Sequence, residues 1–127
     1  MIRRALSGEV LTLYSPGHWI RDYLHVQDAA MAFLYAGAGG HSLAGYHFVI
    51  GSGEGRSLRE AFETISACVF LKNGTKVSIE EVDPPASLSP IDFRDFIANR
   101  EYFSGRTGWR PGIPFEEGIR STLGEMR

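Results

Sequence analysis

The feature that most constrains the fold is a strand–helix–strand pattern between residues 46 and 82. Residues 46–50 read as a short apolar strand. The helix that follows starts at a capping-box pattern, Ser57 with Glu60, and its apolar residues recur at helical spacing. Asn73-Gly74 marks a turn, and residues 76–82 alternate as a second strand. Strand, helix and strand at this spacing predict a right-handed parallel crossover, and therefore an α/β fold.

The rest of the chain adds short strands and helices, for a total of four or five helices. Asp28 is placed to cap a helix over residues 29–36, because its carboxylate can accept hydrogen bonds from the free first-turn N–H groups. The other expected elements are a helix tail at 1–7, a strand at 10–14, a flexible loop at 37–45, brief pairing within 91–97, a short helix at 99–105 and a last helix at 115–126.

Length and composition describe one ordinary globular domain over residues 1–127. The net charge of −2 gives no electrostatic case for nucleic acid or for an anionic membrane. No run of about 18 apolar residues exists that could span a membrane. Arg3 and Arg4 are not followed by an apolar stretch long enough for a signal peptide.

Residues suited to catalysis or metal binding are few. The single cysteine, Cys68, excludes an internal disulfide and a multi-cysteine metal site, fits a cytoplasmic location, and is expected to be a packing residue. The four histidines lack metal-ligand spacing, so no metal is expected. Asp92 and Asp95 could serve acid–base chemistry, but acidic pairs near loops are usually solvated. Trp109 is expected in the core. We therefore assign no catalytic residue.

The glycine-rich loop at residues 51–55 lies between a predicted strand and a helix, where a dinucleotide-binding loop would lie. The G-x-G-x-x-G fingerprint requires glycine at position 56, but Arg56 stands there. Glu80 and Glu81 come too late to be the acidic residue that binds the ribose. The simpler interpretation is a strand-to-helix turn whose free N–H groups could at most help to hold an anion.

Four segments, in this order, resemble the C-terminal, substrate-binding part of the NAD-dependent epimerase/dehydratase family, the extended short-chain dehydrogenases that act on nucleotide-sugars. Residues 11–28 resemble the family's strand, glycine turn and "R-D-[FYW]-hydrophobic-H-V-x-D". Phe48-Val49-Ile50-Gly51 resembles "[FY]-N-[IVL]-G", with Ser57-Leu58 opening the next helix. Residues 108–111 and 115–119 resemble "L-G-W-x-P … [LF]-x-E-G-[IL]". The resemblance covers essentially the whole chain and implies the small α/β substrate-binding domain of that family.

The resemblance implies a nucleotide-sugar site on residues 12–21. In the family, the arginine that matches Arg21 contacts the pyrophosphate, a task that suits a planar, permanently charged guanidinium. The strand that matches Thr12 and Tyr14 lies beside the nucleotide base, and Trp19 is placed to face the same ligand. The alternative for Arg21 is a surface or structural ion pair.

Two departures from the family pattern affect this site. Val49 stands where the family usually has asparagine. Many members also have a second phosphate-contacting arginine in an "R-x-G-D" stretch, and the matching residue here is Ser89. Asp92 keeps the acidic position, and Arg94 is close enough to substitute for the missing arginine. Losing one charge-assisted phosphate contact weakens binding by roughly 1.5–3 kcal/mol.

The family's catalytic machinery is missing from the sequence. None of the five tyrosines is followed by lysine at the Tyr-x-x-x-Lys spacing, and neither the cofactor fold nor its glycine-rich loop is present. The family uses NAD, but no cofactor is expected on this chain. Without a hydride acceptor or a proton-transferring tyrosine, this chain alone is not expected to epimerise, dehydrate or reduce anything.

Three function hypotheses follow. The chain is the nucleotide-sugar-binding part of an epimerase/dehydratase separated from its cofactor half, which the uncapped first helix and the missing catalytic pair favour. It is a free-standing module that binds a nucleotide or nucleotide-sugar without catalysis. Or it is an interaction protein with a vestigial site, which Val49 and Ser89 favour. The expected partners are a nucleotide-sugar and either a second copy in a homodimer or a missing N-terminal cofactor domain.

Overall fold

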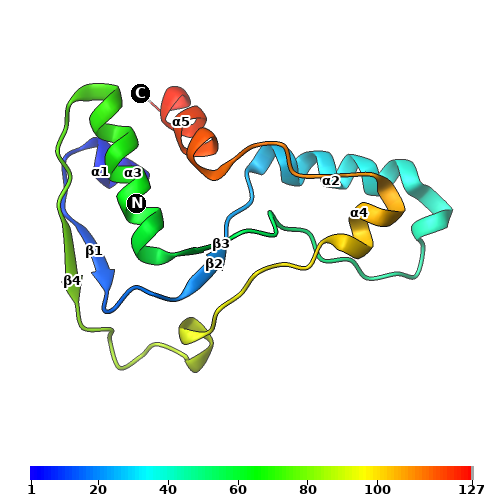
Figure 1. Ribbon diagram of the computed structural model, residues 1–127, viewed down its shortest axis with the longest axis horizontal. Coiled ribbons are helices and arrows are strands. Elements are labelled where there is room, and N and C mark those ends of the chain that lie inside the picture. Colours follow the sequence, from blue (N-terminus) through cyan, green and yellow to red (C-terminus); the bar gives the residue numbers. More distant parts are fainter. Residues whose placement is uncertain (127) are drawn as a thin grey trace.

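The computed structural model describes residues 1–126, and Figure 1 shows helices and strands gathered at two ends of an elongated chain. One end holds α1 (Ile2–Leu6), β1 (Leu11–Tyr14), α3 (Leu58–Asn73), β4 (Ile79–Val82) and α5 (Phe115–Glu125). The other end holds α2 (Val26–Gly39), the 3-10 helix η1 (Gly40–Leu43) and α4 (Glu101–Thr107). Between them lie β2 (Ile20–Asp22) and β3 (Gly55–Ser57), with the 3-10 helix η2 (Pro90–Phe93) below. Five α-helices and short strands, within the described residues, confirm the predicted α/β architecture.

The strands form two separate pairs. β1 and β4 are parallel, with Leu11 opposite Ile79. β2 and β3 are antiparallel, with Arg21 opposite Arg56. The chain therefore leaves β1, passes through β2, α2, β3 and α3, and returns beside β1 in β4. A parallel pair requires such a long crossover, because its two strands run in the same direction.

The predicted strand at residues 46–50 is wrong, and with it the predicted partner of the crossover. These residues form no strand, and the parallel neighbour of β4 is β1. The N–H of Tyr46, at the start of this segment, donates to the carbonyl of Leu43 over 3.2 Å, which is a turn bond and not a strand pairing. An apolar run of this length fits a strand only if another strand lies beside it. Within residues 1–126, none does.

The helix predicted at residues 29–36 is longer than expected and is capped by a different residue. It begins at Val26, and the N-cap is His25, whose ring Nδ1 accepts a bond from the N–H of Gln27 over 3.3 Å. Asp28 lies inside the first turn instead of before it. The helix, α2, continues to Gly39. Together α2 and η1 replace most of the flexible loop expected at 37–45.

The Asp28 side chain instead binds a distant loop. Its carboxylate is buried and accepts bonds from the backbone N–H groups of Gly112, 3.0 Å away, and Ile113, 2.9 Å away. The indole N–H of Trp109 donates to the backbone carbonyl of Asp28 over 3.1 Å. These bonds join the start of α2 to the segment between α4 and α5.

Each of the two ends has its own hydrophobic cluster. The first lies between α3, β1, α1 and α5, and its buried residues are Ala5, Leu11, Leu13, Phe62, Ile65, Cys68, Val69 and Leu123. The second lies between α2 and α4 and is built on Ala32, Phe103 and Trp109, with Leu24, Ala36, Phe48 and Ile50 packed against it. Cys68 and Trp109 are thus core residues, as predicted.

Most other local predictions agree with the structure. The capping box of α3 is present: the hydroxyl of Ser57 accepts from the N–H of Glu60, and the Glu60 carboxylate accepts from the N–H of Ser57. The last helix ends at Glu125, and α4 starts two residues later than expected. The brief pairing expected within 91–97 is reduced to one backbone bond, from Phe96 to Ile20 over 3.0 Å. No helix among residues 1–126 is both long and apolar enough to cross a lipid bilayer.

Candidate functional site

The guanidinium of Arg21 projects from β2 toward the loop that follows η2. One Nη donates to the carbonyl oxygen of Ile20 over 2.9 Å and also to that of Arg94. The other Nη donates to the carbonyl oxygen of Asp92 over 2.5 Å. A guanidinium has five N–H donors, and these three bonds leave two available. Arg21 therefore fixes the loop through its backbone and retains donors for a ligand.

Hydrogen bonds that do not involve Arg21 also fix the loop at residues 89–96. Ser89 and Asp92 form a capping box at η2, in which the Asp92 carboxylate accepts from the N–H of Ser89 over 2.9 Å. The carboxylate of Asp95 accepts from the backbone N–H of Ile20 over 2.7 Å. The backbone of residues 92–96 is thus held along the free edge of β2. The Asp92 side chain therefore caps η2, and the Asp95 side chain links the loop after η2 to β2.

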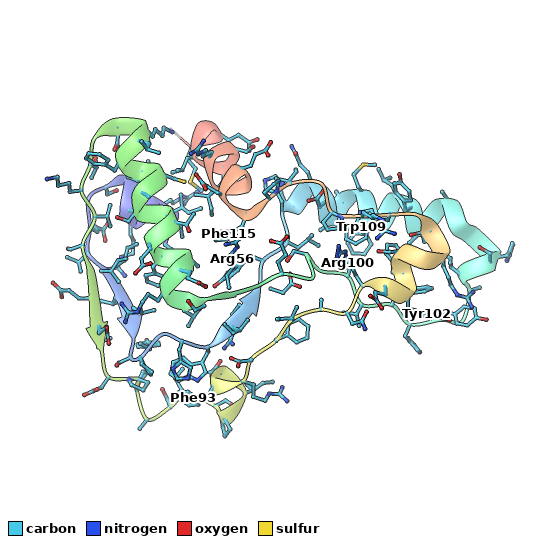
Figure 2. All side chains as sticks on the ribbon, in the orientation of Figure 1. Arg56, Phe93, Arg100, Tyr102, Trp109 and Phe115 are labelled. Atoms are coloured by element: carbon cyan, nitrogen blue, oxygen red, sulfur yellow. The ribbon has the colours of Figure 1, made fainter. Side chains whose placement is uncertain are left out.

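Two aromatic rings stand beside this loop. Trp19 packs edge-on against Phe93, with the ring centroids 4.9 Å apart, and His18 lies 5.0 Å from Trp19. Figure 2 shows Phe93 at the edge of the molecule formed by η2. Arg94, the next residue, is exposed. The structure therefore brings together four of the residues that the sequence singled out, namely Trp19, Arg21, Asp92 and Arg94.

The other two candidate residues lie on a different strand pair. Thr12 and Tyr14 are the outward-facing residues of β1, whose alternate residues Leu11 and Leu13 are buried. β1 pairs with β4, whereas Arg21 belongs to the hairpin of β2 and β3. Thr12 and Tyr14 form an exposed face that is separate from the contacts of Arg21.

Asp22, next to Arg21, makes the most extensive network in this region, and sequence reasoning assigned it no role. Its carboxylate accepts from both the N–H and the hydroxyl of Ser52, each over 2.7 Å, from the N–H of Gly53 over 2.9 Å, and from the N–H of Ala98 over 3.1 Å. Partial burial acts to raise the pKa of Asp22, but these hydrogen bonds outweigh it and lower the pKa. The side chain joins β2, the glycine loop and the segment before α4.

The bonds from Ser52 and Gly53 to Asp22 determine whether the glycine loop at residues 51–55 can bind a dinucleotide. A dinucleotide-binding loop presents free backbone N–H groups to a pyrophosphate. Here the N–H groups of Ser52 and Gly53 both point to the Asp22 carboxylate, a fixed negative charge. The loop therefore does not fit a dinucleotide, and its anion is supplied by the protein itself.

One sequence signal could have revealed this network. Asp22 is a charged residue in the middle of a strand-like segment, followed thirty residues later by a loop of small residues with free N–H groups. Such a carboxylate needs hydrogen-bond donors when it is partly buried. No group of three or more metal-ligating side chains with suitable geometry occurs among residues 1–126.

Comparisons with known proteins agree with this picture. The model of the NAD dependent epimerase/dehydratase family matches residues 1–51. The chain is 28% identical over 123 residues to dTDP-glucose 4,6-dehydratase of Escherichia coli, covering 97% of this chain and 34% of the relative. It is 29% identical over 105 residues to GDP-6-deoxy-D-mannose reductase of Pseudomonas aeruginosa, covering 83% of this chain and 32% of the relative.

The fold agrees as well. The crystal structure of dTDP-glucose 4,6-dehydratase from Bacillus anthracis, in complex with NAD, superposes with a TM-score of 0.72 at 26% identity, over 97% of this chain and 36% of that one. The chain thus spans about a third of the length of the relatives that it matches. Sequence motifs, fold and relatives together show that this chain resembles the NAD-dependent epimerase/dehydratase family.

Proposed function

We propose that this chain binds a nucleotide-sugar as the substrate-binding part of an NAD-dependent sugar epimerase/dehydratase. The observation on which this rests is the position of Arg21. Its guanidinium is fixed by three backbone carbonyls, keeps two N–H donors, and lies in a loop region that also holds Trp19 and Phe93. A fixed arginine binds phosphate at a smaller entropic cost than a mobile one.

The relatives support the ligand class. One is named for dTDP-glucose and another for a GDP-sugar, so a nucleoside diphosphate joined to a sugar is the feature they share. The base and the sugar are left open by this argument, because the two relatives differ in both. Either ligand would present a pyrophosphate to Arg21.

The chain is not expected to carry out the sugar chemistry by itself. Oxidation at the sugar needs a hydride acceptor and a group that moves the hydroxyl proton. The sequence has no Tyr-x-x-x-Lys pair, and the donors of its glycine loop are bound to Asp22. The residues of this chain can therefore bind and orient a substrate for chemistry that other residues perform.

The test is isothermal titration of the chain with dTDP-, UDP-, GDP- and CDP-sugars, with NAD as a negative control. We expect one class to bind, and Arg21→Gln to weaken it by about tenfold or more, because a charge-assisted contact is lost. Because Arg21 also holds the 92–94 loop, each variant is first checked by denaturation. Binding of NAD, or equal binding by Arg21→Gln, would contradict the proposal.

A second candidate function is that of a non-catalytic interaction protein in which the old site is vestigial. It is favoured by the acceptors of Arg21, which in this structure are all backbone carbonyls, and by the exposed apolar surface of α2. No binding to any nucleotide-sugar, combined with stable self-association, would support this candidate over the first.

A further inference from the structure

A ring of hydrogen bonds holds the turn that joins β1 to β2. The carboxylate of Glu81, in β4, accepts from the hydroxyl of Ser15 over 3.0 Å and from the guanidinium of Arg59, in α3. The same Nη of Arg59 donates to the carbonyl oxygen of Pro16 over 3.3 Å. The ring therefore begins and ends on the turn, and it passes through one residue of β4 and one of α3.

Backbone bonds attach the same turn to the start of α3. The first N–H groups of a helix have no partner within the helix. The N–H of Arg59 donates to the carbonyl oxygen of Gly17 over 3.0 Å. The N–H of Leu58 donates to the carbonyl oxygen of Trp19 over 3.2 Å. The turn thus supplies acceptors to α3, and the Arg59 side chain adds the connection to β4 (Figure 1).

Trp19 links this turn to the candidate site. Its backbone is bound to the start of α3, and its ring packs edge-on against Phe93. Phe93 lies between Asp92 and Arg94, the two residues of the loop whose carbonyl oxygens accept from Arg21. The orientation of the Trp19 ring therefore depends on the turn on one side and on the loop held by Arg21 on the other.

The side chains of Arg59 and Glu81 suit a role in fixing the turn more than a role in overall stability. They are 39% and 47% exposed, and exposed ion pairs contribute little to the free energy of unfolding. All of their side-chain bonds go to each other or to the turn. The hydrogen bonds from Arg59 and then from Ser15 lower the pKa of Glu81, so this carboxylate keeps its charge as an acceptor.

We propose that Arg59 and Glu81 are positioning residues for the nucleotide-sugar: by fixing the turn at residues 15–17, they hold Trp19 in the orientation in which its ring faces the ligand. This inference rests on the proposed function and adds two residues that do not touch the ligand. A side chain that is ordered before binding loses less entropy when the ligand arrives. No local sequence signal marks the ring, because Glu81 lies 66 residues beyond Ser15.

The experiment pairs each substitution with a control of the same chemistry. Glu81→Ala removes the acceptor shared by the ring, and Glu80→Ala makes the same change at the neighbouring exposed position of β4. Arg59→Gln removes the charged donor, and Arg120→Gln breaks another exposed arginine–glutamate pair, on α5. Each variant is titrated calorimetrically with the same nucleotide-sugars, and its urea midpoint is measured.

Acrylamide quenching of tryptophan fluorescence reports on the turn directly. Trp19 is partly exposed, whereas Trp109, the other tryptophan, is 2% exposed and therefore shielded from the quencher. We expect Glu81→Ala and Arg59→Gln to increase the quenching of Trp19, while their urea midpoints stay close to those of the controls.

The same two variants should bind more weakly. We expect the dissociation constant to rise about twofold to tenfold, the equivalent of ordering one side chain at an interface. The controls should change it less than about twofold. The double variant Glu81→Ala/Arg59→Gln should bind no more weakly than the weaker single variant, because both residues act through one ring.

The outcomes separate this inference from the proposed function. If nucleotide-sugars bind, and Glu81→Ala and Arg59→Gln bind them as tightly as wild type, the positioning role is overturned while the proposed function stands. Weakening of the same size in the controls, or weakening with unchanged quenching of Trp19, overturns it as well. If no nucleotide-sugar binds the wild-type chain, the proposed function fails, and quenching alone decides whether the ring fixes Trp19. Unfolding of Arg59→Gln, checked by circular dichroism, transfers the test to Glu81→Ala.

Discussion

The indole N–H of Trp109 donates a hydrogen bond to the backbone carbonyl of Asp28, 81 residues earlier in the chain, over 3.1 Å. Three residues beyond Trp109, the backbone N–H of Gly112 donates to the carboxylate of the same Asp28. This relationship joins two of the motifs that resemble the family, the first at residues 11–28 and the second at residues 108–111. The aspartate that ends the first motif and the tryptophan turn of the second form one contact, and that contact holds α2 against the segment leading to α5.

The first prediction concerns Asp28. Asp28→Asn should lower the free energy of unfolding by about 1.5–3 kcal/mol, because the new amide nitrogen cannot accept from one of the two backbone N–H groups. Asp83→Asn makes the same change at an exposed position and should stay within about 0.5 kcal/mol of wild type. Urea denaturation measures both. Equal stability of the two variants would show that the Asp28 bonds contribute nothing.

The second prediction concerns the pH dependence that Asp22 gives to stability. Although partial burial acts to raise it, the folded-state pKa of Asp22 lies below the ordinary value of 3.8 for an aspartate carboxyl, because its carboxylate accepts hydrogen bonds from Ser52, Gly53 and Ala98 that outweigh the effect of burial. A depressed carboxyl pKa contributes stability that is present above the unfolded-state pKa and is lost as the pH falls through the folded-state pKa. Asp22→Asn should therefore be less stable than wild type near neutral pH, and the gap should narrow below a pH of about 4. Urea midpoints measured from neutral pH down to about pH 2.5 test this, and a gap that stays constant would contradict it.

The third prediction compares two glycines. A Cβ on Gly51 would overlap the Cβ of Ala98 and lie 2.8 Å from the Asp22 carboxylate, so Gly51→Ala should cost about 1–3 kcal/mol and disturb the Asp22 network. Gly105, in α4, has open space around a new Cβ, and Gly105→Ala should add about 0.4–1 kcal/mol by restricting the unfolded chain. Both are measured by chemical denaturation. A stable Gly51→Ala would mean that the loop and the 98 segment can move apart at little cost.

The elements that could be predicted from the sequence are those whose signals are local. The capping box of Ser57 and Glu60 places the start of α3 correctly, because all of its bonds fall within four residues. Asp28 has the chemistry of a cap, yet its carboxylate bonds to residues more than eighty positions away. Nothing in the local sequence distinguishes these two uses of a carboxylate. The strand expected at 46–50 fails for the same reason, since pairing depends on a neighbour that residues 1–126 do not provide.

In the candidate site, too, some residues could be identified from the sequence and others depend on contacts between distant segments. The resemblance to the family brought Arg21, Trp19, Asp92 and Arg94 forward, and the structure places them together. The four bonds of Asp22 and the opposition of Arg21 to Arg56 depend on strand register and loop position. Register is set by long-range packing, so a single sequence without a known partner strand does not reveal it.

The last prediction concerns self-association through α2. The only charged residue of this helix, Asp28, is buried, while several large apolar side chains face solvent, among them Phe33 at 71% and Leu34 at 65% exposure. Monomeric proteins rarely leave large apolar patches uncovered, and an uncharged patch can pack against its own copy without repulsion between like charges. We therefore expect a dimer at high micromolar concentration in sedimentation velocity. Phe33→Glu should shift the species toward the single chain of 14.1 kDa, whereas Phe70→Glu, an equivalent change at a 48% exposed position on α3, should leave the dimer in place. A wild-type chain that sediments as a monomer at that concentration would rule out this use of α2.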